Sequence, residues 1–230
     1  MSLQQTLFES REDLNQSFAD TIVSILEAAI ARDGKASLVV SGGSTPLPLF
    51  QALSQRDLAW SKVTVTLADE RWVDNQHDAS NEKLVTDNLL VGKAAAAQFF
   101  ALKTEHEDAQ HAVTQLNSAA GQPKQPFDVL ILGMGEDAHT ASLFPCCAQI
   151  QAGLALDNPS TFIATQPTTA PHQRMSYTLA ALVKAKHIFL HLTGDKKRSV
   201  LEQALQTKNA EEKPIKAVVD NADVTLMWAP

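Results

Sequence analysis

The sequence predicts a single α/β domain over residues 1–230, in which helices cover both faces of a mostly parallel sheet in a Rossmann-like three-layer arrangement. Short apolar runs alternate along the chain with segments that repeat apolar residues at intervals of three and four. The apolar runs are nearly continuous, as in strands that are covered on both faces. The length of 230 residues suits one α/β domain, and the chain shows no internal repeat.

The first helix is marked at both ends. Ser10 followed by Asp13 resembles a capping box, and Gly34 is a natural helix stop. Between these two ends, apolar residues recur at helical spacing at Leu14, Phe18, Ile22, Ile25 and Ala29.

The remaining elements follow in alternation. Buried parallel strands are predicted at residues 37–40, 63–67, 127–132, 162–164, 188–192 and 224–228. Helices are predicted between them at residues 46–53, 81–90, 105–119, 179–184 and 196–205. This order favours right-handed strand–helix–strand units and therefore a parallel sheet.

Composition excludes several classes of protein. Hydrophobic residues make up 44% and charged residues 20%, as in an ordinary globular protein, and the net charge is −7. An acidic chain is not expected to bind nucleic acid or an anionic membrane. The chain shows no signal-peptide pattern, and its two cysteines are adjacent and lack C-x-x-C spacing. We therefore expect a cytoplasmic protein, either a monomer or a small homo-oligomer.

Four predicted strands run directly into polar or glycine-rich sequences. These are SGGSTP at 41–46, ADERW at 68–72, GMGEDAHT at 133–140 and TGDKK at 193–197. In open parallel sheets, ligands bind outside the carboxyl ends of the strands. We therefore expect the four sequences to converge on one crevice.

The first of these sequences has the features of an anion-binding turn. Gly42 and Gly43 allow a sharp turn that exposes backbone N–H groups. Ser44 or Thr45 could cap the helix that follows, and Pro46 suits its first turn. Such a turn binds phosphate at a helix N-terminus, although it lacks the G-K-[ST] of a Walker A loop. The alternative is a plain strand-to-helix turn.

The second sequence places Asp69, Glu70 and Arg71 at a strand end, before a long polar loop that reaches Ser80. Three consecutive charges are costly to bury, so a solvated loop is the simplest interpretation. A long loop without regular structure is more often functional, and Arg71 could hold an anionic group or a developing oxyanion.

The third sequence superficially matches a dinucleotide fingerprint through Gly133, Gly135 and Ala138. We reject this interpretation because the match lies in the middle of the chain. In addition, Pro145 would leave only about two turns for the helix that must follow.

The same segment holds a candidate general base. His139 lies two residues after Asp137. Histidine is the side chain whose unperturbed pKa lies near working pH, so a histidine with a neighbouring carboxylate is a candidate general base. The other histidines lack such a setting and are expected to be structural or solvated: His77, His106, His111, His172, His187 and His191.

Two further cations are candidates for holding an anion. Arg174 ends a proline-rich stretch, and Lys197 opens a helix together with Lys196 and Arg198. Cations at a helix N-terminus oppose the helix dipole unless an anion compensates them. The alternative is a solvated basic cluster. No spacing in the chain indicates a metal site, and no cofactor is expected.

These motifs together resemble the 6-phosphogluconolactonase family, within a larger group that includes glucosamine-6-phosphate deaminases. The matching segments are SGGSTP at 41–46, ADERWV at 68–73, SN at 80–81, GMGEDAHTASLFP at 133–145, RMS at 174–176 and G-x-x-K at 194–197. Two positions are informative. The family usually has glycine where this chain has Ala138, and the related deaminases carry a catalytic glutamate where this chain has Phe144.

The resemblance implies hydrolysis of 6-phospho-D-glucono-1,5-lactone in the oxidative pentose phosphate pathway. It implies His139 as the base, with Asp137 or Asp69 orienting it or the sugar, and Arg71 at the oxyanion. The implied substrate- and phosphate-binding residues are Gly42, Gly43, Ser44, Thr45, Asn81, Arg174 and Lys197.

Two alternatives stay open from the sequence. One is an enzyme like the glucosamine-6-phosphate deaminases, and the other is a non-catalytic sensor of sugar phosphates. A sensor that regulates transcription would need a DNA-binding segment, and the chain has no spare basic segment for one.

Overall fold

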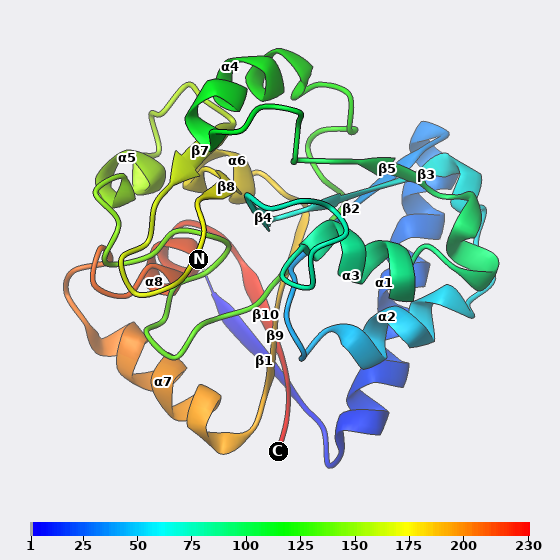
Figure 1. The fold of residues 1–230 in the computed structure, drawn as a ribbon. Coiled ribbons are helices and arrows are strands. Elements are labelled where there is room, and N and C mark those ends of the chain that lie inside the picture. The colour runs from blue at the N-terminus through cyan, green and yellow to red at the C-terminus, as the bar shows by residue number, and fades with distance from the viewer. Residues whose placement is uncertain (1) are drawn as a thin grey trace.

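The computed structural model describes residues 2–230, and its main sheet has seven strands that all run parallel. The strand order is β1-β10-β9-β6-β2-β3-β5 (Figure 1). Their bounds are β1 Leu3–Leu7, β2 Ala36–Val40, β3 Val63–Leu67, β5 Gln98–Phe100, β6 Val129–Leu132, β9 His187–Thr193 and β10 Val224–Ala229. The predicted parallel sheet is confirmed.

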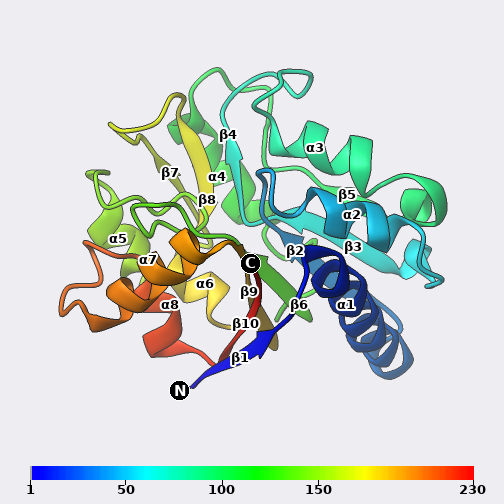
Figure 2. The same cartoon turned by 90° about the horizontal axis from the view of Figure 1, so that it is seen from below.

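Helices cover both faces of this sheet. Figure 2 shows α1 and α2 on one side of the central strands and α7 and α8 on the other. The helices are α1 Arg11–Asp33, α2 Leu47–Ser54, α3 Asn81–Asn88, α4 Ala109–Ala119, α5 Ile150–Leu154, α6 Leu179–Leu182, α7 Asp195–Gln206 and α8 Ile215–Asn221. Short 3₁₀ turns occupy Trp60–Lys62 and Gly92–Ala96.

The ends of α1 form as their residues predict. The Ser10 hydroxyl accepts a hydrogen bond of 3.1 Å from the backbone N–H of Asp13. Gly34 ends the helix with a φ of 73°, a left-handed conformation that suits glycine. The buried stripe differs slightly from the expected one, because Leu26 is fully buried whereas Ile25 is only half-buried.

A second, smaller sheet was not expected. It is antiparallel and has the order β4-β8-β7, with β4 at Asp69–Arg71, β8 at Arg174–Tyr177 and β7 at Phe162–Thr165. The prediction of 162–164 as a parallel strand of the main sheet is therefore wrong, as is that of a loop at 69–71. An apolar run indicates a buried strand, but it does not reveal which strand will pair with it.

Several short elements carry too little pattern to be predicted. The edge strands β1 and β5 lie mostly exposed or half-buried, and the helices α5 and α8 span only 5 and 7 residues. The helix expected from residue 105 begins at Ala109, where Asp108 caps it by accepting from the N–H of Gln110.

The chain order places a topological switch between β6 and β2. From β2 the chain moves outward to β3 and β5, and from β6 it moves the other way to β9 and β10. The loops after β2 and β6 therefore diverge and leave a crevice between them. The four strands that end in polar sequences, β9, β6, β2 and β3, are immediate neighbours. Their convergence on one crevice is confirmed.

Within residues 2–230, no helix combines the length and the apolar character needed to cross a membrane.

Candidate active site

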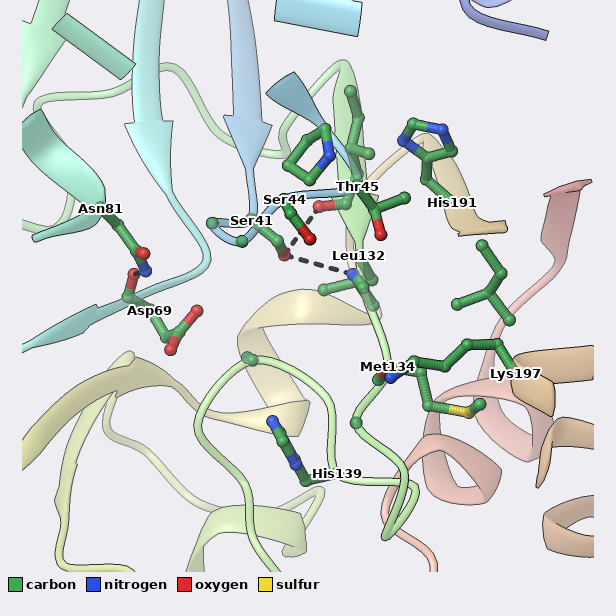
Figure 3. A pocket seen from close by; sticks show the side chains of 18 of the residues that line it. Ser41, Ser44, Thr45, Asp69, Asn81, Leu132, Met134, His139, His191 and Lys197 are labelled. Carbon is green, nitrogen blue, oxygen red and sulfur yellow. Dashed lines mark hydrogen bonds between the residues drawn. The ribbon is translucent and has the colours of Figure 1, made fainter. Parts of the chain in front are cut away.

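A pocket of about 250 Å³ opens at the carboxyl ends of these four strands (Figure 3). Among the predicted site residues, those that line it are Gly42, Gly43, Ser44, Thr45, Asp69, Arg71, Asn81, His139, Arg174 and Lys197. Asp137 does not line the pocket, and its carboxylate contacts the His139 ring. Residues from all four polar sequences therefore reach one space.

His139 is held in place on two sides. Its Nδ1 lies 2.6 Å from Oδ1 of Asp137, which also accepts a 3.1 Å hydrogen bond from the backbone N–H of His139. The Phe144 ring stacks on the imidazole, with centroids 3.9 Å apart and planes 23° apart. Because Nδ1 is occupied by the carboxylate, Nε2 is the nitrogen that can exchange a proton.

The electrostatics of this pair favour an ionised carboxylate. Partial burial raises the pKa of Asp137, but its hydrogen bond to His139 and the charge of that ring outweigh burial and leave the pKa below its usual value. An ionised Asp137 keeps the proton on Nδ1 and stabilises the imidazolium that forms when Nε2 accepts a proton.

The loop around His139 has no regular structure. No helix directly follows Gly133, as the rejection of the dinucleotide fingerprint requires. Instead, Thr140 donates from its hydroxyl to the carbonyl of Gly133 at 2.8 Å, and the N–H of Gly135 donates to the carbonyl of His139 at 2.9 Å. These bonds close the segment into a compact turn that points the imidazole into the pocket.

Ala138 adopts the strained conformation that its position predicts. Its φ is 68°, a value that favours glycine, and the residue is fully buried. Its carbonyl accepts a 3.0 Å hydrogen bond from the N–H of Ile215, at the start of α8. The loop is therefore held in this conformation by a segment about 77 residues away in the sequence, so the alanine is tolerated.

Asp69 and Asn81 form the opposite wall. Asp69 is buried and accepts a hydrogen bond from the Ser142 hydroxyl. Asn81 donates from its side chain to the Asp69 carbonyl at 2.9 Å. A Cβ at Gly42 would lie 1.8 Å from the Asn81 side chain, so glycine is required there for the two segments to pack.

Glu70 is a functional neighbour that the sequence did not single out. Its carboxylate is fully buried and accepts from the backbone N–H groups of Arg71, Asn81 and Glu82 at 2.6–2.8 Å. The Ser80 hydroxyl donates to it at 3.2 Å. Burial raises the pKa of Glu70 to about 7. The side chain ties β4 to the start of α3, which explains how a charged run can form a strand.

Arg71 and Arg174 face each other across the small sheet, as a cross-strand pair of β4 and β8. Each donates to one backbone carbonyl, Arg71 to Ala79 at 2.7 Å and Arg174 to Pro171 at 3.2 Å. In the described chain, neither has a carboxylate within 4.0 Å, and the buried Nε of each lacks a partner. Two adjacent cations without a counter-ion favour the binding of anionic groups.

The lysine cluster at the start of α7 divides into separate roles. Lys196 forms a surface ion pair of 2.7 Å with Glu136, and Arg198 lies 3.4 Å from a carboxylate one turn along the helix. Lys197 points into the pocket and donates to the carbonyl of Met134. Partial burial lowers the pKa of Lys197. Only Lys197 therefore remains for a bound anion.

The predicted capping role of Ser44 and Thr45 is wrong. Pro46 occupies the N-cap position of α2, and no side chain caps this helix. The turn bends at Gly43, where φ is 105°. Neither hydroxyl bonds another residue in 2–230, and both line the pocket. They are free to bind a ligand.

One histidine from the group expected to be structural also reaches the pocket. His191 lies on β9, is 2% exposed and is part of the pocket wall. Its place in the nearly continuous apolar run of β9 gave no sign of this position.

Within the described part of the chain, no group of three or more His, Cys, Asp or Glu residues could hold a metal ion.

Comparisons with known proteins agree with this geometry. The family model described as "Glucosamine-6-phosphate isomerases/6-phosphogluconolactonase" matches residues 9–228. A 6-phosphogluconolactonase of Rhizobium meliloti is 41% identical and is covered over the full length of both chains. One from Neisseria meningitidis serogroup A is 42% identical over 94% of each chain.

Solved structures give the same result. A 6-phosphogluconolactonase from Shewanella baltica superposes with a TM-score of 0.97 at 42% identity, over 100% of this chain and 98% of that one. A monomeric glucosamine-6-phosphate deaminase shares the fold, with a TM-score of 0.82 at 16% identity over 99% and 97% of the chains. The chain belongs to the glucosamine-6-phosphate isomerase/6-phosphogluconolactonase family.

Proposed function

We propose that this protein is a 6-phosphogluconolactonase, which hydrolyses 6-phospho-D-glucono-1,5-lactone to 6-phospho-D-gluconate in the oxidative pentose phosphate pathway. The observation that carries the proposal is His139, whose Nδ1 is bound by Asp137 and whose ring stacks on Phe144. Full-length relatives at 41–42% identity bear this name. We further propose a cytoplasmic monomer or small homo-oligomer that binds this small molecule and neither nucleic acid nor membrane.

His139 acts as the general base and then as the general acid. Its Nε2 takes a proton from a water molecule as the water oxygen attacks C1 of the lactone. The tetrahedral intermediate collapses with cleavage of the bond between C1 and the ring oxygen. The imidazolium returns its proton to that oxygen, which becomes the hydroxyl of the open-chain acid. Asp137 stabilises the imidazolium between the two steps.

Arg71 stabilises the oxyanion that develops on the carbonyl oxygen. Its guanidinium lines the pocket and has no carboxylate partner in residues 2–230. Asp69, which Ser142 and Asn81 hold in place, orients the sugar hydroxyls. Because Asp137 is the carboxylate that hydrogen-bonds the His139 imidazole, Asp69 is available to bind the substrate.

The phosphate binds between the turn after β2 and the start of α7. The hydroxyls of Ser44 and Thr45 and the N–H groups of Gly42 and Gly43 supply donors. Arg174 and Lys197 supply charge, and neither is neutralised by a carboxylate within 4.0 Å in the described chain. Holding the phosphate places the lactone carbonyl near His139.

Phe144 separates this proposal from a deaminase. The related glucosamine-6-phosphate deaminases need a carboxylate at the position of Phe144. In this chain the apolar Phe144 ring stacks on the His139 imidazole instead. A glucosamine-6-phosphate deaminase has the same fold, so the fold alone does not distinguish the two reactions.

The direct test is hydrolysis of freshly prepared 6-phosphogluconolactone near neutral pH, corrected for spontaneous opening. Wild-type protein should turn it over, and His139→Ala should lower kcat on the order of 10²–10⁴-fold with an unchanged melting temperature. Near-wild-type turnover by the variant would reject the role of His139. Release of ammonia from glucosamine 6-phosphate would favour the deaminase, and binding of the lactone without turnover would favour a sensor.

A further inference from the structure

His191 has no role in the proposed reaction, although it lies in the wall of the pocket. Figure 3 shows His191 and Thr45 on the side of the pocket away from His139. The side chain faces α1, where Phe18 packs edge-on against it with ring centroids 5.4 Å apart. His191 therefore lies where α1 packs against β9, in the wall of the pocket that Ser44 and Thr45 also line.

Both ring nitrogens of His191 are buried and have no hydrogen-bond partner among residues 2–230. Burial lowers the pKa of this histidine to about 4, so the ring is neutral at neutral pH, with one donor and one acceptor. Buried polar groups are almost always hydrogen-bonded, to protein or to ordered water. A partner outside the protein is therefore expected.

A second buried polar atom, on α1, also lacks a hydrogen-bond partner within residues 2–230. Oδ1 of Asn15 is also buried without a partner in the described chain, although its Nδ2 donates to the Arg11 carbonyl at 2.6 Å. Asn15 lies one turn from Phe18 on the buried face of α1. Polar groups of this kind are the usual partners of buried water.

The turn itself lacks an anchor at this end. Its first residue, Ser41, donates to the Ile131 carbonyl at 3.0 Å and accepts from the N–H of Gly133 at 3.4 Å. The hydroxyls of Ser44 and Thr45 bond no other residue within 2–230, and no side chain caps α2. The part of the turn proposed to hold phosphate therefore makes no side-chain hydrogen bond to the rest of residues 2–230.

We propose that His191 is a positioning residue for the 41–46 turn, acting through a water molecule that its ring binds in the wall of the pocket. Through this contact His191 sets the arrangement of the phosphate-binding groups and so the affinity for phosphorylated ligands. The inference rests on the proposed function, because it concerns the phosphate subsite of the same pocket.

The test compares His191→Phe, which keeps a ring against Phe18 but has no polar atoms, with His191→Gln, which restores a donor and an acceptor. Loss of one hydrogen bond should raise KM for 6-phosphogluconolactone about fivefold to tenfold in His191→Phe. The kcat should stay within about twofold, because His139 is untouched. His191→Gln should recover most of the lost affinity, and unphosphorylated gluconolactone should be hydrolysed alike by all three proteins.

Calorimetric titration with 6-phosphogluconate provides a readout without turnover, and its affinity should fall in His191→Phe by a similar factor. His187→Leu, at the exposed start of the same strand, is the control and should match wild type. If His191→Phe does not fold, His191→Leu replaces it.

An unchanged KM, or an equal loss for both lactones, would overturn the role of His191, as would a failure of glutamine to restore affinity. Wild-type protein without lactonase activity would instead overturn the proposed function.

Discussion

Glycines in the pocket are required by the side chains that they face. A Cβ at Gly135 would lie 2.1 Å from Nδ1 of His139 and 2.5 Å from Oδ1 of Asp137. A Cβ at Gly42 would meet the Asn81 side chain in the same way. Neither glycine has a positive φ, so close approach and not backbone conformation explains them.

Gly135→Ala should therefore damage catalysis more than stability. The added methyl group must push the imidazole and the carboxylate of Asp137 from their 2.6 Å contact. We expect kcat to fall by on the order of 10-fold to 100-fold, as when a group that orients a catalytic residue is lost. Steady-state kinetics and thermal unfolding measure the two effects.

The matched control for this substitution is Gly121→Ala. A Cβ at Gly121 meets no atom within 4 Å, and its φ is not in the left-handed region. The control should keep wild-type kcat. A Gly135→Ala variant with wild-type kcat would show that the geometry of the histidine and aspartate is not needed.

Lys197→Ala should act on binding. Because Lys197 is the cation of its cluster that faces the pocket, its removal should raise KM for 6-phosphogluconolactone by about tenfold or more and leave kcat nearly unchanged. Lys196→Ala removes a neighbouring charge that pairs with Glu136 on the surface, and KM should not change. A fall in kcat alone for Lys197→Ala would contradict the phosphate-binding role.

At the scale of elements, one carboxylate joins a strand to a helix. Glu70 on β4 accepts the N–H groups of Asn81 and Glu82, which open α3 and would otherwise lack partners. Glu70 also accepts from the Ser80 hydroxyl and so fixes the end of the loop from residue 72 to residue 80. The position of Asn81 in the wall thus depends on a residue that touches no substrate.

Glu70 also predicts a dependence of stability on pH. Burial raises its pKa in the folded state to about 7 from an ordinary value of 4.5. The folded state therefore binds this proton more tightly than the unfolded state, and its contribution to stability is present below pH 4.5 and is lost as the pH rises through 7.

Glu70→Gln removes this titration. The quantity to compare is the free energy of unfolding of wild type minus that of Glu70→Gln. This difference should fall as the pH rises from about 4.5 to 7, by at most about 1.4 kcal/mol per pH unit. Urea unfolding at several pH values measures the difference. Glu27→Gln, at an exposed position on α1, controls for the loss of a surface charge. A difference between wild type and Glu70→Gln that is constant with pH would contradict the assignment.

At the scale of the whole molecule, an acidic protein concentrates unpaired positive charge in one pocket. The net charge is −7, while Arg71, Arg174 and Lys197 all line the pocket without a carboxylate partner in the described chain. Raising the ionic strength should therefore weaken binding of the phosphorylated lactone, because salt screens the attraction.

We expect KM for 6-phosphogluconolactone to rise several-fold between about 0.05 and 0.5 M salt, while KM for unphosphorylated gluconolactone stays constant. Parallel assays of the two lactones measure this difference. An equal change for both substrates would show that salt acts on the protein as a whole and not on the phosphate subsite.

Much of the architecture could be predicted from local pattern. Apolar runs and helical spacing report the preferences of adjacent residues, and alternation of the two implies a parallel sheet. Because parallel strands end at one edge, the sequences at 41–46, 68–72, 133–140 and 193–197 had to meet. This reasoning identified the pocket and the histidine in it from sequence alone.

The tertiary structure decided what depends on distant partners. Arg71 meets Arg174, and Asp69 meets Ser142, across more than 70 residues of chain. Such pairings commit Asp69 to Ser142 and place the charged β4 in a sheet with β8. The sequence by itself determined the sheet and the motifs at its edge, since both follow from local preferences. Burial and pairing were decided only in the folded chain, because they depend on which remote segments supply hydrogen bonds and exclude water.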